Sequence, residues 1–261
     1  MAIRCKIRRA LGGLAAVFAM PLAGCAAPPS HTASLSQGFN AYTQRQYAQA
    51  SQVARAYIAG NPNGTQLDYA YYLLGIANES RGRFTLAHGE FLRSIALTHR
   101  DSVRRKAYKA LGDMAYTRTH YNTAATYYQS ALSAMDGRTP PAPLLFRLGA
   151  SLQDAGHWGQ ARQPLSEAIS FAPGTPAAQN ASQRLAATHF SLQYGAFLVN
   201  GSAWAMVGQM RTTQLSAMVV PAVVAGRTLY LVQSGNFSTL SAAMAARSAV
   251  SRNYPQVIVV P

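Results

Sequence analysis

The sequence predicts two domains: an all-α array of helical repeats, followed by a small α+β domain. Two internal repeats carry this prediction. Four glycines recur at an interval of 37 residues in the first part of the chain, at Gly38, Gly75, Gly112 and Gly149. A different repeat, displaced by 40 residues, lies within 190–261. The composition, with 49% hydrophobic residues, is that of a globular protein.

Two further positions follow each glycine in register. Nine residues after it stands a large aromatic residue (Tyr47, Phe84, Tyr121 and Trp158), and three residues later an alanine (Ala50, Ala87, Ala124 and Ala161). Small side chains in two facing helices let their backbones approach, with the aromatic residue wedged beside them. Each block therefore predicts two short helices, with the glycine in the first and the alanine in the second.

This pattern resembles the tetratricopeptide repeat (TPR), whose usual period is about 34 residues. The flanking residues agree: leucines precede three of the glycines, alanines recur late in two blocks, and prolines close two blocks (Leu74, Leu111, Leu148, Ala131, Ala168, Pro62 and Pro173). We expect the extra residues in the turns, near 61–64 and 138–141. The segment 175–188 is expected to cap the array, which would span 33–189. Pro164 falls inside the second helix of the fourth block, where it removes a hydrogen bond.

The TPR resemblance implies an inner groove lined by first-helix positions. Carried over, these are Phe39, Tyr42, Tyr69, Tyr72, Ile76, Lys106, Lys109, Tyr116 and Phe146. The groove is aromatic with one basic spot, which suits an extended peptide with apolar side chains and a carboxylate held by Lys106 or Lys109. The alternative is that several of these aromatics only pack between helices. Leu35 and Phe39 stand where some relatives carry the polar clamp for carboxyl termini, so that clamp is not expected.

The C-terminal repeat consists of a strand followed by a helix. Gln193-x-Gly195-x-Phe197-x5-Ala203 recurs as Gln233-x-Gly235-x-Phe237-x5-Ala243. Alternating and helical periodicity predict strands at 190–197, 218–224, 228–234 and 256–260, and helices at 202–211 and 239–252. The order β-α-β-β-α-β predicts a ferredoxin-like fold, with a four-stranded antiparallel sheet and both helices on one face.

These residues resemble the SPOR domain, through Gln193-Tyr194-Gly195-Ala196-Phe197 and Tyr230-x-Val232-x-x-Gly235-x-Phe237. The resemblance implies binding to peptidoglycan glycan strands that have lost their stem peptides. Alternation places Leu192, Tyr194, Tyr230 and Val232 toward the helices, and Ser191, Gln193, Gly195, Leu231 and Gln233 outward. We expect glycan contacts from Gln193, Gly195, Gln233, Gly235 and Asn236. Leu231 and Asn236 stand where the family often has arginine and proline. The alternative is a module whose glycine and phenylalanine positions are only architectural.

The N-terminus has the layout of a secretory signal. Arg4, Lys6, Arg8 and Arg9 precede an apolar run from 10 to 23, which is too short to span a bilayer. Leu22-Ala23-Gly24-Cys25 resembles the lipobox of bacterial lipoproteins, which implies cleavage after 24, acylation of Cys25 and a tether at 25–32. Ala26 favours the outer membrane by the same resemblance. An ordinary signal peptide with a cysteine at its cleavage site is the alternative.

Charge and motifs limit the remaining function classes. The chain carries a formal charge of +15, and 190–261 holds four arginines and no acidic residue. Positive charge suits an anionic polymer or surface without choosing among them. Neither HExxH, G-x-S-x-G, a cysteine pair nor a phosphate loop is present, and the histidines are dispersed. We expect no catalytic residue, no cofactor and no metal.

The sequence therefore predicts an envelope lipoprotein on the periplasmic side of a bacterial membrane. Its expected partners are peptidoglycan glycan strands, envelope or divisome proteins, and the membrane through a lipid anchor, with no nucleic acid. It would localise or coordinate septal wall synthesis or remodelling. One alternative is a scaffold for assembly of a secretion or pilus machine. Another is an accessory subunit that brings a separate hydrolase to glycan.

Overall fold

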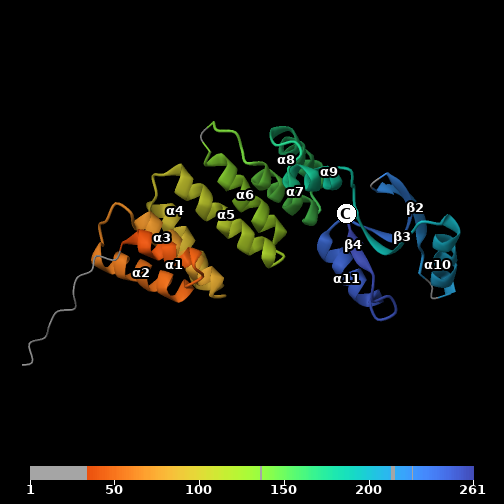
Figure 1. Cartoon of the computed structure of the whole chain (residues 1–261), viewed down its shortest axis with the longest axis horizontal. Coiled ribbons are helices and arrows are strands. Elements are labelled where there is room, and N and C mark those ends of the chain that lie inside the picture. The colour runs from red at the N-terminus through yellow and green to blue at the C-terminus, as the bar shows by residue number, and fades with distance from the viewer. Residues whose placement is uncertain (1–33, 136, 213–214, 225) are drawn as a thin grey trace, which may run out of the picture. The chain divides into compact units, whose positions relative to one another are not determined.

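The computed structural model describes residues 34–135, 137–212, 215–224 and 226–261 (Figure 1). The predicted signal, Cys25 and the tether lie outside these ranges. Every described helix and strand falls within one compact unit, Ala33–Pro261. The order of elements is that of an all-α region followed by an α+β domain, which confirms the predicted fold class.

The helices of the first region pack in sequence order, each against the next, as Figure 1 shows. Within the described residues they are α1 (Leu35–Thr43), α2 (Tyr47–Gly60), α3 (Leu67–Ser80), α4 (Phe84–Leu97), α5 (Asp101–Thr117), α6 (Tyr121–Ser133), α7 (Ala142–Asp154), α8 (Trp158–Phe171) and α9 (Pro176–Leu185). The four predicted glycines lie in α1, α3, α5 and α7. The four predicted aromatics are the first residues of α2, α4, α6 and α8.

Gly75, Gly112 and Gly149 lie closely against a side chain of the second helix of their own pair, and Gly38 lies closest to Leu73 of α3. A Cβ atom placed on Gly75 would lie 2.6 Å from the ring of Phe91, and one on Gly112 would lie 2.6 Å from the ring of Tyr128. The alanines of the second helices are fully buried. At Gly75 and Gly112, no side chain larger than hydrogen fits without moving the packed ring.

The same turn joins the two helices in all four blocks. Its central residue has positive φ and is Arg45, Gly82, Thr119 or Gly156. In the second block Gly82 N donates to Glu79 O at 2.8 Å and Arg83 N donates to Asn78 O at 2.8 Å, and the other three blocks repeat this pair of bonds. This is the Schellman arrangement, which satisfies the last carbonyls of the first helix.

The expected cap is present as α9, which packs on α7 and α8. Thr175 precedes it, and its hydroxyl accepts a hydrogen bond from Ala178 N at 3.3 Å. The helix ends at Leu185, three residues before the predicted end. Pro164 lies inside α8 as predicted, and it is buried.

The C-terminal domain has the predicted order β1 (Phe190–Phe197), α10 (Asn200–Thr212), β2 (Met218–Val224), β3 (Arg227–Phe237), α11 (Leu240–Val250) and β4 (Ile258–Val260). The strands pair antiparallel in the order β2-β3-β1-β4. One cluster joins the buried strand residues Leu192, Tyr194 and Val232 to residues of both helices. Both helices therefore cover one face of the sheet, as expected.

Two β-bulges interrupt the pairing of β1 with β3. Gln193 pairs with Gln233, but Gly195 pairs with Val232, so Tyr194 is an extra residue in β1. Since Val232 faces the helices, Gly195 also faces the helices beyond this bulge. The prediction that Gly195 points outward is therefore wrong. The second bulge lies in β3, between the pairs Leu192–Ser234 and Phe190–Phe237.

We predict that Gly75→Ala lowers the free energy of unfolding by about 1–3 kcal/mol, because the new methyl group would overlap the ring of Phe91. Gly89→Ala in α4 is the matched control, since a Cβ atom there meets nothing within 4 Å. It should raise stability by about 0.5–1 kcal/mol through helix propensity. Denaturant unfolding of both variants measures the difference, and equal effects would contradict the assigned close approach.

Candidate functional site

A row of four side chains crosses the sheet on the face away from the helices. Met218 pairs with Gln233, Gln233 with Gln193, and Gln193 with Ile258, so the row takes one residue from each strand. Both glutamines are half-buried, whereas Met218 and Ile258 are 62% and 48% exposed. The structure thus brings the two predicted glutamines together and flanks them with exposed apolar side chains.

The glutamine amides contact each other across the two strands. Gln233 Nε2 donates to Gln193 Oε1 at 3.4 Å, and among the described residues neither amide makes another hydrogen bond. One NH₂ group and one carbonyl oxygen therefore keep free hydrogen-bonding capacity. Such a pair can both donate to and accept from hydroxyl or acetamido groups.

The two predicted glycines lie against aromatic rings of the same domain. A Cβ atom on Gly195 would lie 2.8 Å from the ring of Phe197, and one on Gly235 would overlap the ring of Phe237. Gly235 also has φ +83°, at the bulge. Each glycine makes room for the phenylalanine two residues later, so the space is filled by the chain's own ring. The packing of the two phenylalanine rings therefore requires these glycines, and a direct contact of either glycine with glycan stays a prediction.

The other expected residues of this face differ in their exposure. Asn236 is exposed beside Gly235 at the bulge, so it can reach a ligand. Ser191 was expected on the open face, but it is only 7% exposed, and its hydroxyl donates to Gly235 O at 3.4 Å. Leu231 is half-buried and pairs with Ala196, so this part of the face is apolar.

Several predicted groove residues of the helical region already have partners within the chain. The guanidinium carbon Cζ of Arg100 lies over the ring of Tyr69, 5.3 Å from the ring centroid. The Tyr72 ring lies 5.9 Å from that of Phe91, and the Tyr42 hydroxyl accepts from Ser80 Oγ at 3.4 Å. Burial raises the pKa of Tyr72 to about 12. These aromatic side chains pack within the repeats as well as lining the groove positions.

Tyr116 belongs to a buried polar group at the end of the array. Its hydroxyl donates to Asp154 Oδ2 at 2.5 Å, and Arg184 Nη1 lies 2.7 Å from Asp154 Oδ1. Asp154 is fully buried, so its charge depends on this pair for compensation. Burial, followed by the charge of Asp154, raises the pKa of Tyr116.

Two acidic residues of the groove were missed by the sequence reasoning. Asp113 lies 2.6 Å from Lys109 Nζ and 3.3 Å from Arg147, so Lys109 is already neutralised. Burial raises the pKa of Glu79 to about 7; Asp113 adds to the rise and Lys109 opposes it. The repeat could have revealed both residues, because Glu79 occupies the position of Tyr42 and Tyr116, and Asp113 that of Ile76. Lys106 is exposed and has no ion pair among the described residues.

Two hollows lie in the later blocks. One of about 490 Å³ is lined by two predicted groove residues, Tyr116 and Phe146, together with Pro143, Arg147 and Pro176. Another of about 1190 Å³ is lined largely by α6 and α8, and Leu145, Leu148 and Leu152 of α7 contribute to its lining.

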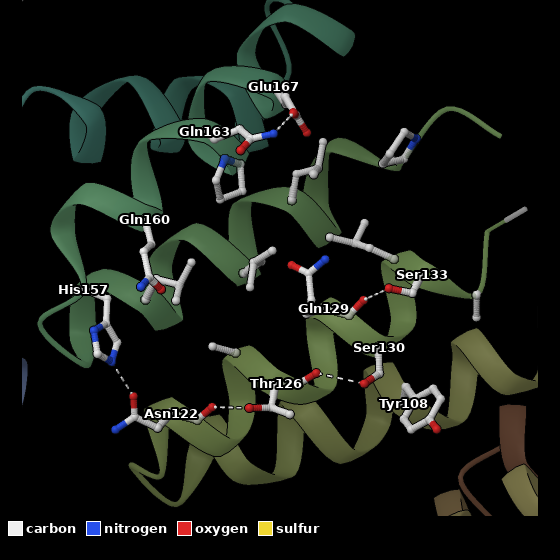
Figure 2. Close-up of a pocket in the computed structure, with 18 of the residues that line it drawn as sticks. Tyr108, Asn122, Thr126, Gln129, Ser130, Ser133, His157, Gln160, Gln163 and Glu167 are labelled. Carbon is white, nitrogen blue, oxygen red and sulfur yellow. Dashed lines mark hydrogen bonds between the residues drawn. The ribbon is translucent and has the colours of Figure 1, made fainter. Parts of the chain in front are cut away.

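Figure 2 shows the larger hollow with Gln129, Gln160 and Gln163 on its walls. Its hydroxyls turn back onto their own helix, as Ser130 Oγ donates to Thr126 O at 3.0 Å. His157 Nε2 lies 2.8 Å from Asn122 Oδ1 at one end. This surface was not predicted from the sequence, because only groove positions of first helices were carried over, whereas most of this lining comes from the second helices α6 and α8.

In the part of the chain that the structure describes, we find no cluster of three or more histidine, cysteine or acidic residues that could hold a metal ion. Within the same ranges, no helix combines the length and the apolarity that crossing a bilayer requires.

Comparisons with known proteins divide the chain in the same way as its fold. Residues 186–261 match the SPOR domain family. No match was found among curated proteins. A crystal structure of MamA protein is similar at 21% identity and a TM-score of 0.44, over 52% of this chain and 69% of that one.

Two other solved structures are similar to the helical region. MamA from Desulfovibrio magneticus RS-1, from residue 41 to its end, has 16% identity and a TM-score of 0.48, over 59% of this chain and 82% of that one. The C-terminal part of a TPR repeat-containing protein from Cytophaga hutchinsonii has 13% identity and a TM-score of 0.46, over 58% and 64%. With its four glycine-containing helix pairs and the matched C-terminal domain, the chain combines TPR-like helical repeats with a C-terminal SPOR domain.

Proposed function

We propose that this protein is a non-enzymatic envelope lipoprotein that binds denuded peptidoglycan glycan strands through its SPOR domain and protein partners through its helical repeats. A SPOR domain indicates peptidoglycan binding, and TPR-like repeats indicate protein interaction. The observation that carries the glycan assignment is the row Met218–Gln233–Gln193–Ile258 on the open face of the sheet.

The chemistry of this row suits the hydroxyl groups, acetamido groups and ring faces of a sugar chain. The two amides offer a donor and an acceptor side by side, and the flanking Met218 and Ile258 offer apolar surface for the faces of sugar rings. Removal of stem peptides leaves a lactyl carboxylate on each muramic acid. Residues 190–261 hold four arginines and no acidic side chain, so this carboxylate would be attracted.

We predict that Gln193→Ala/Gln233→Ala weakens binding of the protein to amidase-treated sacculi by about one to two orders of magnitude, because two ordinary hydrogen bonds are lost. Stability should change by no more than about 0.5 kcal/mol, since the side chains lie on the open face. Sedimentation with treated and untreated sacculi, alongside a thermal melt, measures both quantities.

Asn253→Ala/Gln256→Ala is the matched control, because it removes two exposed amides outside the row. It should bind like the parent. A parent without preference for treated sacculi, or a control as weak as the glutamine variant, would refute the assignment of this face.

For the protein partner, the hollow around Phe146 is the best-supported part of the groove. It combines apolar lining from Pro143, Phe146 and Pro176 with one cation, Arg147. This composition suits a peptide with an apolar side chain next to a carboxylate. Asp113 lies 2.6 Å from Lys109 and 3.3 Å from Arg147, so a bound carboxylate would compete with Asp113 for either cation.

We predict that a photo-crosslinking amino acid at position 146 captures an envelope protein in living cells at several times the yield of one at position 86. Leu86 is the control because it is 50% exposed on α4, away from the hollow. Mass spectrometry of the crosslinked products measures the yields. Equal crosslinking yields from positions 146 and 86 would refute binding of the partner in this hollow.

The membrane anchor rests on Cys25, which lies outside the described residues. Each methylene of an acyl chain buried in lipid contributes roughly 0.8 kcal/mol, so several chains give a lasting anchor. We predict that the parent is processed and incorporates labelled palmitate, whereas Cys25→Ser stays unprocessed and incorporates none. Labelling and processing equal to the parent would favour the ordinary signal peptide.

We place the role of the protein at the septum, where amidases expose denuded glycan. The secretion or pilus scaffold remains the alternative, in which the repeats carry the function. Septal enrichment of the tagged protein that disappears in Gln193→Ala/Gln233→Ala supports the first role. The same localisation in the parent and in Gln193→Ala/Gln233→Ala supports the scaffold.

A further inference from the structure

A third surface lies on the second helix of the first block, away from the sheet and the hollow around Phe146. It is a hollow of about 510 Å³ between α2 and the turn that joins α3 to α4. Its lining contains three arginines, two other polar residues and three alanines: Arg55, Arg81, Arg83, Ser51, Gln52, Ala48, Ala56 and Ala59. The alanines leave its floor shallow and keep the guanidinium groups around the rim.

The three arginines are exposed, and within the described residues none of them forms an ion pair. Neither α1 nor α2 contains an acidic residue. Glu90 is an acidic residue that interacts electrostatically with Arg55: burial raises the pKa of Glu90, and the charge of Arg55 opposes this rise. Guanidinium groups match the oxygens of phosphate with two parallel hydrogen bonds each, so this rim has the donor set for an oxyanion.

A buried hydroxyl adds a second, independent observation. Ser51 lines the hollow and is 3% exposed, and among the residues that the structure describes its Oγ has no hydrogen-bond partner. Other helical hydroxyls of this chain donate to the carbonyl four residues earlier, as Ser130 does to Thr126 O at 3.0 Å. A buried hydroxyl without a partner costs free energy that a ligand can recover. An oxyanion is an acceptor and supplies what Ser51 lacks.

The backbone holds two of the arginines in place. Gly82 has φ +71° between them, and Arg83 N donates to Asn78 O at 2.8 Å. This turn is the same in all four blocks, but only here are both residues beside its central residue arginines. Arg81 and Arg83 are therefore presented from a fixed turn, and they line the same hollow as Arg55 of α2.

We propose that this hollow binds the phosphate of an anionic lipid headgroup. The phosphate chemistry follows from the three arginines and Ser51 alone; the choice of lipid as its source rests on the proposed anchor. Cys25 precedes Leu35 by ten residues, which span at most about 35 Å, so an acylated chain keeps the first block near the bilayer surface. An anionic surface attracts arginine within about a Debye length.

The test uses the compact unit 33–261, which contains every described element and lacks the predicted anchor. Calorimetric titration with inorganic phosphate tests the site, and sedimentation with phosphatidylcholine vesicles and with mixed phosphatidylcholine–phosphatidylglycerol vesicles tests the source. We expect phosphate binding and a preference for the mixed vesicles. Arg55→Gln/Arg83→Gln should weaken vesicle binding about thirtyfold, from two lost arginine contacts.

Two further variants separate a built site from general charge. Arg138→Gln/Arg162→Gln removes the same charge from exposed positions in later blocks and should bind like the parent. Ser51→Ala should weaken phosphate binding several-fold without lowering the melting temperature, because its hydroxyl has no partner to lose. Equal loss in both arginine pairs, or no phosphate binding by the parent, overturns the site. Phosphate binding without preference for the mixed vesicles overturns the lipid assignment. Failure of Cys25 acylation would leave all these measurements unchanged.

Discussion

The structure of the helical region depends on the contact between a glycine in one helix and a side chain in the next. At Gly75 and Gly112 the partner is a buried aromatic ring, and at Gly149 it is Leu165, with a Cβ atom placed on the glycine 2.5 Å away. The contact fixes how closely the helices of each pair approach. At Gly38 the nearest side chain is Leu73 of α3 instead. Because the glycines themselves recur every 37 residues, equivalent positions of successive first helices are presented at a constant interval. The groove is a consequence of this spacing.

That constant interval explains how much of the fold could be predicted from the sequence. It located the helix pairs, and it would have placed Glu79 and Asp113 in the groove had their positions been carried over with the aromatics. It could not predict the contacts that join neighbouring blocks. Asp154 is compensated by Tyr116 from the block before it and by Arg184 from α9, and no pattern within one block relates these three residues.

In the SPOR domain the predicted orientation of side chains failed at the β-bulge of β1, where the inward and outward alternation shifts by one residue. Simple alternation holds from Leu192 to Tyr194, and it placed Gln193 correctly on the open face. The bulge at Tyr194 then shifts every later residue of β1 to the other face. Directly after this bulge the ring of Phe197 fills the space beside Gly195. A glycine followed two residues later by phenylalanine occurs in both copies, so the signal was present, but its geometric meaning depends on how the ring packs.

The proposed binding surfaces differ in their physical chemistry, and this difference lets one chain hold several partners without competition. The open sheet face presents amides and apolar side chains, whose contacts depend little on ionic strength. The hollow beside Ser51 presents three arginines, whose attraction to phosphate is screened over about 8 Å at physiological salt. The amide pair itself is uncharged, so the arginines of the first block can serve membrane attraction while Gln193 and Gln233 retain specificity for glycan. The four arginines of 190–261 add attraction for the lactyl carboxylate of the glycan.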